Sequence, residues 1–348
     1  MNPLVSVIIP TLDSGKTIEE TLISLKKQSF DPSLIEVIVI DGGSKDKTLS
    51  IAINYGCTIL KNKKKQQEYA KHIGLLNAKG RYLMFLDSDE VLESTFSLKN
   101  RLALFYKNKS VKILFSSGYK QPKKYSLTND YINTFGDPFS YYMYGISPNY
   151  FFFINDFKKR HKNYHETKDY CIFFFSKNET LPLIDLCAGT IIEKKYLNNK
   201  IKLTLNNAQI VPTVPYVLMS TSKSIAILKD DPIVHNSANN LKKYLNKLSW
   251  KVLVNVHYKN LPGTGFSNRE NFQPISFAIK KYFFILFALT LIGPLLISFY
   301  FFIFRKKSIA LLLHLPLTIY VAFCIIIYYF LNLLGIKPNL FVYGKVKK

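Results

Sequence analysis

Arg81-Tyr82-Leu83-Met84-Phe85-Leu86-Asp87-Ser88-Asp89 is the stretch that decides the fold. Its apolar run predicts a buried strand, and the strand ends on two carboxylates one residue apart. Like charges this close repel, and each is costly beside an apolar core unless a cation lies between them. A divalent cation with oxygen ligands meets that need, and nucleotide phosphates commonly complete its shell. The stretch therefore predicts a metal-assisted nucleotide site at a strand end.

Strand and helix patterns alternate through the first ninety residues. Strands are predicted at residues 5–9, 36–40 and 58–60, and helices at residues 18–25, 46–54 and 66–77. This alternation predicts a parallel sheet with helices on its faces, which is the α/β class. Ligands of such sheets bind beyond the carboxyl ends of the strands. We therefore expect the polar side chains at these ends to converge, namely Thr11, Asp13, Asp41, Asp87 and Asp89.

The composition narrows the possible partners. The formal net charge of the 348-residue chain is +24, which suits nucleic acid, an anionic membrane surface or phosphorylated ligands. The four cysteines, Cys57, Cys171, Cys187 and Cys324, show no C-x-x-C spacing. Their spacing argues against a zinc site or a disulfide framework and indicates a reducing compartment. The chain begins without a signal-like segment, so we expect its N-terminal part to be cytosolic.

Two long runs without charged residues lie near the C-terminus, at residues 282–304 and 310–334. Each is long enough to cross a bilayer of about 30 Å. We expect residues 282–335 to form a transmembrane helical hairpin; two buried core helices are the alternative. More basic residues lie beside the two ends of the hairpin than at its tip, residues 305–307. Residues 336–348 form a basic tail. The positive-inside rule then predicts a multi-pass protein of the cell membrane with its N-terminal domain, which carries the predicted nucleotide site, in the cytoplasm.

Two segments before the hairpin have mixed character. Residues 107–180 interleave aromatic and basic side chains, which is typical of a nucleic-acid surface, a membrane interface or the core of a helical insertion. The hairpin favours an insertion that faces the membrane or an acceptor, and we expect no nucleic-acid partner. Residues 237–281 contain an amphipathic helix. That helix either lies on the membrane as an interfacial linker or packs on the domain.

The N-terminal motifs resemble family 2 glycosyltransferases. The resemblance is carried by Val5-Ser6-Val7-Ile8-Ile9-Pro10-Thr11, by residues 37–48, by Asn77-Ala78-Lys79-Gly80 and by the Asp87-Ser88-Asp89 (DxD) motif, so it covers residues 4–92. It implies a GT-A fold, a Rossmann-like nucleotide-diphospho-sugar transferase domain, over residues 1–236. It also implies a nucleotide-diphosphate sugar donor, Mg²⁺ or Mn²⁺, and inversion at the anomeric carbon.

The resemblance also implies roles for individual residues. Those that would line the nucleoside pocket are Pro10, Thr11, Asp13 and Asp41. Asp87 would contact the ribose or the metal, and Asp89 would ligate the metal. Lys71 either contacts a phosphate or is simply solvated. His235 either helps to hold the diphosphate or metal, or is a buried structural histidine.

One motif typical of the family is missing. Relatives usually carry a Glu/Asp-Asp pair after the small-residue turn at residues 188–190, and one member takes the proton of the acceptor hydroxyl. Residues 206–213 contain no carboxylate, and the possible substitutes are Asp137, Asp185, Asp230 and Asp231. An acceptor phosphate, already ionised at neutral pH, would need no base. We expect a membrane-anchored inverting glycosyltransferase with a polyprenyl-phosphate or lipid-linked acceptor. The alternative is a catalytically silent protein that binds nucleotide sugar or a partner enzyme.

Overall fold

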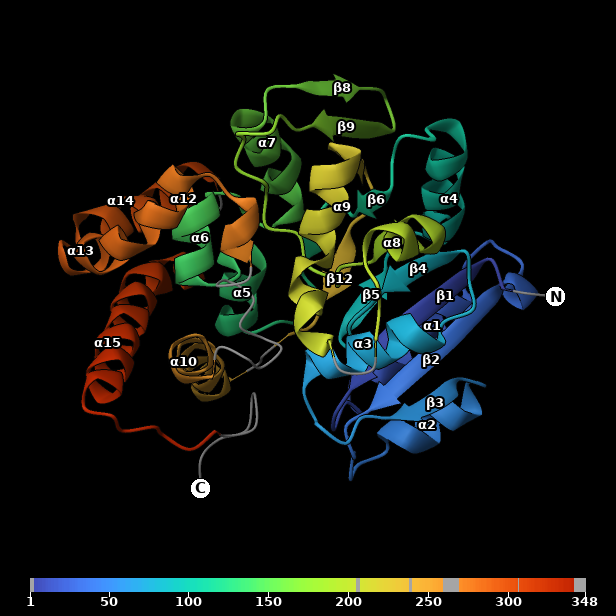
Figure 1. Cartoon of the computed structure of the whole chain (residues 1–348), viewed down its shortest axis with the longest axis horizontal. Coiled ribbons are helices and arrows are strands. Elements are labelled where there is room, and N and C mark those ends of the chain that lie inside the picture. The colour runs from blue at the N-terminus through green and yellow to red at the C-terminus, as the bar shows by residue number, and fades with distance from the viewer. Residues whose placement is uncertain (1–2, 205–206, 238–239, 259–268, 306, 341–348) are drawn as a thin grey trace.

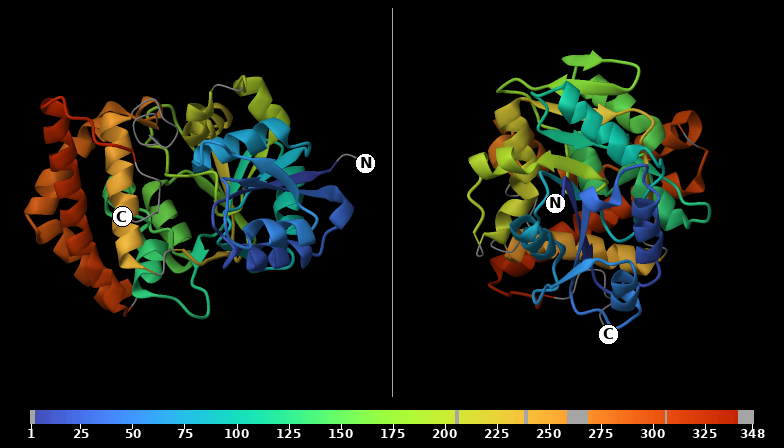
Figure 2. Two further views of the ribbon diagram at one scale, coloured as in Figure 1. Left: turned by 90° about the horizontal axis from the view of Figure 1, so that it is seen from below. Right: turned by 90° about the vertical axis from the view of Figure 1, so that its right-hand side faces the viewer.

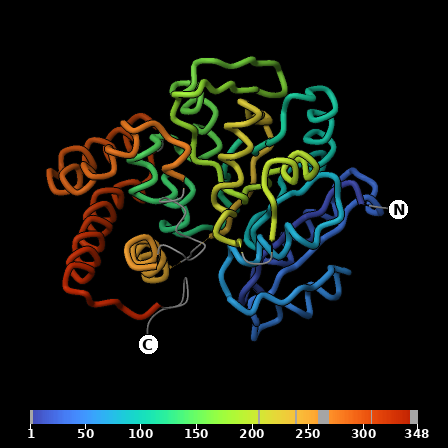
Figure 3. The backbone as a smooth tube through the Cα atoms, in the orientation of Figure 1, coloured from blue at the N-terminus to red at the C-terminus, as the bar shows by residue number. Residues whose placement is uncertain are grey.

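The computed structural model describes residues 3–204, 207–237, 240–258, 269–305 and 307–340. Asn206, Lys306 and part of the predicted linker and basic tail (238–239, 259–268 and 341–348) lie outside the described residues. The centre is a nine-stranded mixed sheet in the order β3-β2-β1-β4-β10-β6-β11-β9-β8 (Figure 1). Figures 2 and 3 show the N-terminal strands at one end of the molecule and the C-terminal helices at the other.

Four parallel strands form the N-terminal half of the sheet. They are β1 (Val5–Thr11), β2 (Ile35–Asp41), β3 (Thr58–Lys61) and β4 (Tyr82–Phe85). The flanking helices are α1 (Ile18–Lys26), α2 (Thr48–Asn54) and α3 (Gln67–Asn77). Every residue of β1 and β4 is buried, because both faces of a parallel sheet are covered by helices. The predicted α/β class is therefore confirmed.

The other half of the sheet is mixed. β10 (Thr190–Glu193) runs antiparallel between β4 and β6 (Ile113–Phe115). The remaining strands are β11 (Ser224–Leu228), β9 (Tyr170–Phe174) and β8 (Tyr164–Glu166). Helices α4 (Ser97–Lys107), α8 (Lys194–Lys200) and α9 (Val214–Ser222) accompany this half.

A second, three-stranded sheet brings distant segments to the end of β4. It contains β5 (Glu90–Leu92), β12 (Ile233–His235) and β7 (Tyr119–Lys120). β12 pairs antiparallel with β5, so that His235 lies opposite Glu90. This pairing places His235 next to the Asp87–Asp89 motif although almost 150 residues of sequence separate them.

The aromatic insertion packs on the C-terminal helices. It forms α5 (Leu127–Phe135), α6 (Pro138–Tyr144) and α7 (Tyr150–Arg160). Tyr131, Phe135 and Phe152 are buried in one apolar cluster with Phe284 and Phe301. Many of these aromatic side chains therefore fill a core, which was one of the three interpretations of this segment.

The C-terminal helices differ from the predicted hairpin. Within the described residues, the stretch Ile309–Leu333, which contains α15 (His314–Leu333), is the one single helix long and apolar enough to cross a membrane. Residues 282–304 do not form one helix. The segments Ile275–Leu289, with α12 (Ile275–Lys280) and α13 (Phe284–Leu289), and Ile292–Arg305, with α14 (Ile292–Tyr300), meet at 85°.

The bend has a local cause in the sequence. Leu291 has a φ of +63°, and Pro294 lies in the first turn of α14. Proline is tolerated in a first helical turn but cannot continue an existing helix, because it lacks an N–H and clashes with the preceding turn. A second straight spanning helix is therefore not confirmed. α10 (Leu241–His257) lies beside α15 and buries Tyr244 and Leu248 in the same cluster as the insertion.

Candidate active site

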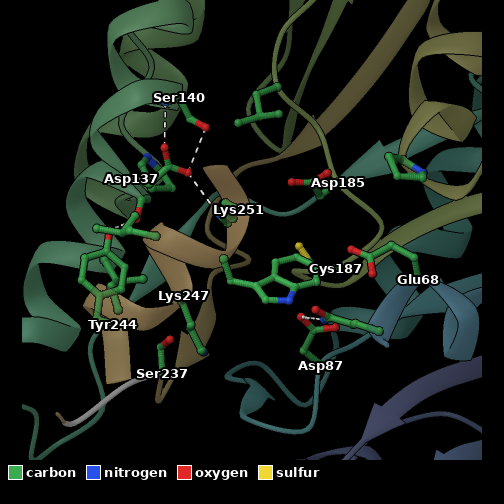
Figure 4. A pocket seen from close by; sticks show the side chains of 18 of the residues that line it. Glu68, Asp87, Asp137, Ser140, Asp185, Cys187, Ser237, Tyr244, Lys247 and Lys251 are labelled. Atoms are coloured by element: carbon green, nitrogen blue, oxygen red, sulfur yellow. Dashed lines mark hydrogen bonds and ion pairs between the residues drawn. The ribbon is translucent and has the colours of Figure 1, made fainter. Parts of the chain in front are cut away.

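A cavity of about 1500 Å³ lies between the carboxyl ends of β1 and β4 and the C-terminal helices. Its lining includes the predicted residues Pro10, Thr11, Asp13, Lys71, Asp87, Asp89 and His235. Asp41 is the one predicted site residue outside this lining. Figure 4 shows Asp87, Cys187, Glu68 and Asp185 on one side and Asp137, Tyr244, Lys247 and Lys251 on the other. Thr11, Asp13, Asp87 and Asp89 thus converge on one cavity as expected, whereas Asp41 does not line it.

Asp41 organises the loops that follow β1 and β2. Its Oδ2 accepts the backbone N–H groups of Gly43 (2.8 Å) and Ser44 (3.0 Å), and its Oδ1 accepts the Ser44 hydroxyl (2.5 Å). Asp13 ties the two loops together, because its N–H donates to Ser44 Oγ and its carboxylate accepts the N–H of Lys45. Asp41 therefore positions the loop beside the cavity, and its predicted role in the nucleoside pocket stays a prediction.

Asp87 is held by two side chains from α3. Gln67 Nε2 donates to Asp87 Oδ2 (2.6 Å), and Lys71 Nζ lies 3.2 Å from Asp87 Oδ1. Gln67 and Lys71 are one helical turn apart, so they reach the same carboxylate. Gly74 lets this helix approach the sheet, because a Cβ there would lie 2.4 Å from Ile8 Cγ2.

Lys71 is buried, which excludes the alternative of a simply solvated lysine. Burial lowers the pKa of Lys71, but the neighbouring acidic groups, the carboxylate of Asp87 first among them, raise it above the usual lysine value. The ammonium therefore stays charged and places a fixed positive charge at the base of the cavity.

His235 faces Asp89 with the ring nitrogen that carries no proton. Its Nε2 lies 3.9 Å from Asp89 Oδ2, and its Nδ1 lies 2.6 Å from Asn133 Oδ1. The amide nitrogen of Asn133 donates to the carbonyl of His235, so the amide oxygen must accept the proton from Nδ1. Burial lowers the pKa of His235 to about 4, although the charge of Asp87 opposes this. A neutral imidazole lone pair that faces a carboxylate fits a divalent cation between them.

Glu90 is a site residue that sequence reasoning missed. It is fully buried, and its Oε2 accepts the N–H groups of Asp87 (2.9 Å) and Ala188 (2.8 Å). Its Oε1 accepts the hydroxyl of Tyr119 (2.8 Å), whose ring stacks on His235. Burial raises the pKa of Glu90, and Asp87 raises it further. The sequence offered one signal for Glu90, namely its position directly after Asp89.

Asp87, Glu90 and Cys187 form the group with metal-ligand spacing among the described residues, with ligand atoms within 4.8 Å of one another. Burial raises the pKa of the Cys187 thiol well above its usual value. A protonated thiol is a poor metal ligand. Glu90 Oε2 already accepts the N–H groups of Asp87 and Ala188, so we interpret Glu90 as support for Asp87 rather than as a ligand.

The possible substitutes for the missing base divide into two pairs. Asp137 and Asp185 line the cavity, whereas the described lining contains neither Asp230 nor Asp231. Asp185 pairs with Arg269. Asp137 accepts from Ser140 and pairs with Lys251 Nζ (3.0 Å).

These contacts weaken Asp137 as a base. Burial raises the pKa of Asp137, but Lys251 and the Ser140 hydrogen bonds outweigh it and leave the pKa below its usual value. Elsewhere, Asp231 forms an ion pair with Arg101 (Nε to Oδ2, 2.7 Å), and exposed Asp230 accepts the hydroxyl of Tyr150. None of the described residues 207–213 is a carboxylate.

The mixed sheet with carboxylates at the end of β4 defines the class of GT-A glycosyltransferases. The family model for glycosyl transferase family 2 matches residues 6–181, just over half of the chain. The chain belongs to this family.

Curated relatives match the N-terminal part. A glycosyltransferase of Rickettsia prowazekii is 34% identical over 108 residues, which are 29% of this chain and 33% of that protein. The poly(ribitol-phosphate) β-N-acetylglucosaminyltransferase TarS of Staphylococcus aureus is 36% identical over 93 residues, 25% of this chain and 16% of TarS. The matches thus span a third or less of these two relatives.

A solved structure extends the likeness to nearly the whole chain. The mannosyltransferase PcManGT from Pyrobaculum calidifontis, in complex with GDP-Man and Mn²⁺, superposes with a TM-score of 0.55 at 14% identity. The superposition covers 96% of this chain and 88% of PcManGT. At this level of identity the likeness concerns the fold alone.

Proposed function

We propose that this protein transfers a sugar from a nucleotide-diphosphate donor to a polyprenyl-phosphate or other lipid-linked acceptor, with inversion at the anomeric carbon. One observation carries the proposal: the last residues of β1, Pro10 and Thr11, and the following Asp13 open onto the same cavity as Asp87 and Asp89 after β4. Parallel sheets bind ligands at such carboxyl ends. The names of the relatives support the same chemistry, since PcManGT is a mannosyltransferase described with GDP-Man and Mn²⁺.

A divalent cation, Mg²⁺ or Mn²⁺, would be held by Asp89 and His235, with Asp87 beside them. His235 Nε2 and Asp89 Oδ2 lie 3.9 Å apart with their lone pairs facing each other, and this arrangement fits a divalent cation bound to both atoms. Bound there, the cation supplies positive charge against the diphosphate leaving group. Lys71 would add a second positive charge near the phosphates, because Asp87 keeps it protonated in a buried position.

The membrane part of the proposal rests on the surface of the C-terminal helices. Most of the exposed large apolar side chains of the described residues lie on the segment from α12 to α15, for example Leu296, Phe330 and Leu333. Apolar surfaces of this extent mark contact with a membrane or a partner. Together with one helix long enough to span a bilayer, this supports a cell-membrane protein, and the basic flanks favour a cytoplasmic catalytic domain.

A catalytically silent protein that binds nucleotide sugar or a partner enzyme is the second candidate. It is favoured by the absence of a carboxylate among the described residues 207–213 and by the ion pairs that occupy Asp137 and Asp185. The two candidates share donor binding and differ in turnover.

Purified protein, incubated with Mg²⁺ or Mn²⁺ and a panel of UDP- and GDP-sugars, tests the proposal. We expect metal-dependent thermal stabilisation by one donor and release of nucleoside diphosphate. Asp89→Ala should abolish the metal-dependent stabilisation with an unchanged circular dichroism spectrum. Asp230→Ala, an exposed aspartate outside the described lining, is the matched control. Donor binding without turnover would favour the silent candidate, and an absence of binding would refute both.

A further inference from the structure

A row of lysines on α10 faces the cavity opposite the donor end. Lys243, Lys247 and Lys251 follow one another at intervals of four residues, and all three line the cavity. Successive members are therefore about 6 Å apart along the helix axis. Like charges at this spacing repel one another along a helix, and Asp137 pairs with one of them, Lys251. We call these three residues the lysine row.

The middle member of the row, Lys247, lies toward the predicted metal site. The charge of Lys247 acts on the carboxylate of Asp89 and on the imidazole of His235, in both cases beside a larger effect of burial. Figure 4 shows Lys247 on the side of the cavity that faces Asp87, with Lys251 and Asp137 further along the same side. An anion bound at the row therefore lies next to the place where the donor diphosphate is expected.

The same cavity continues into an apolar region. Val252 and Val256 of α10, Ile285 of α13, and Val321 and Ile325 of α15 line it. The outer surfaces of α13 and α15 carry the exposed apolar side chains. One cavity thus joins a cationic row to an apolar lining whose helices form the apolar surface of the molecule.

We propose that the lysine row binds the phosphate of a long-chain lipid monophosphate, that the lipid chain lies along the apolar lining, and that this phosphate is the sugar acceptor. This inference rests on the proposed glycosyl transfer and names its acceptor subsite. A phosphate oxygen forms a bond to the anomeric carbon as the bond from that carbon to the donor diphosphate breaks. The diphosphate leaves with the electron pair, and the acceptor dianion becomes a phosphodiester monoanion, so no proton has to move.

A phosphate acceptor also accounts for the carboxylates of the cavity. A hydroxyl acceptor needs a base of suitable pKa within reach. Asp137 and Asp185 are both in ion pairs, and the pKa of Asp137 is lowered. An ionised phosphate instead needs cations that orient it, which the lysine row provides.

The single tryptophan of the chain provides a direct assay, because Trp250 is on α10 and lines the cavity. Its fluorescence is titrated in the full chain with a fifteen-carbon prenyl monophosphate and with the corresponding alcohol. We expect saturable binding of the monophosphate and affinity for the alcohol lower by about tenfold or more. Lys243→Gln/Lys247→Gln should raise the Kd for the monophosphate by about tenfold or more and leave the Kd for the alcohol unchanged.

Lys242→Gln is the matched control, because Lys242 is an exposed lysine of the same helix outside the described lining. The control should bind the monophosphate like the unaltered protein, and thermal unfolding checks that both variants are folded. Equal affinity for monophosphate and alcohol, or equal loss in the row and control variants, overturns the inference.

Transfer assays separate this inference from the proposed function. Sugar incorporated into the prenyl monophosphate but not into the alcohol supports it. Turnover of the nucleotide sugar with water or a glycan, but not with the monophosphate, overturns the inference and leaves the proposed glycosyl transfer intact. If the protein neither binds a donor nor turns it over with any acceptor, both the proposed glycosyl transfer and this inference are overturned.

Discussion

Glu90 couples the donor end of the cavity to pH. The pKa of this buried carboxyl is raised above its ordinary value of 4.5, first by burial and then by Asp87. Above the ordinary pKa, the folded protein therefore retains a proton that the unfolded chain has released. The free energy of unfolding should consequently fall as the pH rises above this value.

We expect Glu90→Gln to flatten this dependence. The amide oxygen of glutamine can accept the N–H groups of Asp87 and Ala188, and its NH₂ can donate to the Tyr119 oxygen, so the variant should fold. Thermal unfolding of both proteins between about pH 5 and about pH 9, with a chelator present, measures the slopes. Identical slopes would show that Glu90 does not titrate as its burial requires.

Residues at strand ends were predictable, whereas their supports were not. Asp87, Asp89 and Thr11 follow apolar runs, so their meeting point follows from the parallel pairing of β1 and β4. Gln67 and Glu90 support Asp87 through contacts that depend on how α3 and β5 pack. The position of Glu90 directly after Asp89 was a signal, but local sequence patterns do not show which groups these side chains contact.

At the scale of elements, Arg101 of α4 joins three segments. Its Nε lies 2.7 Å from Asp231 Oδ2, and its Nη1 donates to the carbonyl of Gly189. Gly189 lies in the turn before β10, and Asp231 lies in the connection between β11 and β12, which carries His235. The fully buried guanidinium thus fixes the segment that presents His235.

Arg101→Met should destabilise the protein by about 3–5 kcal/mol, because it leaves Asp231 buried without its counter-charge. Arg101→Met/Asp231→Asn should recover part of that loss. Lys120→Met, which breaks the half-exposed pair with Glu93, should cost about 1 kcal/mol or less. Chemical unfolding of the three variants measures these changes in the free energy of unfolding. Equal losses of stability for Arg101→Met and Lys120→Met would contradict the role of Arg101.

Helices and strands with a clear apolar periodicity in the sequence were predicted well, whereas interruptions of a helix were not. The strands at residues 5–9, 36–40 and 58–60 and the helix at 66–77 are confirmed as β1, β2, β3 and α3. The run at 282–304 is uniformly apolar, and its apolar character conceals the break at Leu291 and Pro294. The pairing of β12 with β5 depends on contacts distant in sequence and was not predicted.

At the scale of the whole molecule, the sheet, the helical insertion and the C-terminal helices line one cavity, and the insertion and those helices also share one apolar cluster. Phe135 of the insertion lines the cavity and packs against Phe301, while Val321 of α15 belongs to both the cavity lining and the cluster. The C-terminal helices are therefore part of the site. Under the proposed function, a lipid acceptor would reach the donor end along these helices.

The proposed membrane contact predicts how the protein responds when membranes are washed. Apolar contact is insensitive to salt, so the full chain should remain with liposomes in flotation assays after washes with high salt and with carbonate. Leu296→Glu/Ile327→Glu places charges on exposed apolar positions of α14 and α15 and should weaken the association, because a charge at bilayer depth costs about 2.5–3.5 kcal/mol. Phe96→Glu, a similarly exposed position next to α4, is the control and should float like the unaltered chain. Release by salt alone, or equal release of both variants, would show that the apolar face of α12–α15 contacts something other than lipid.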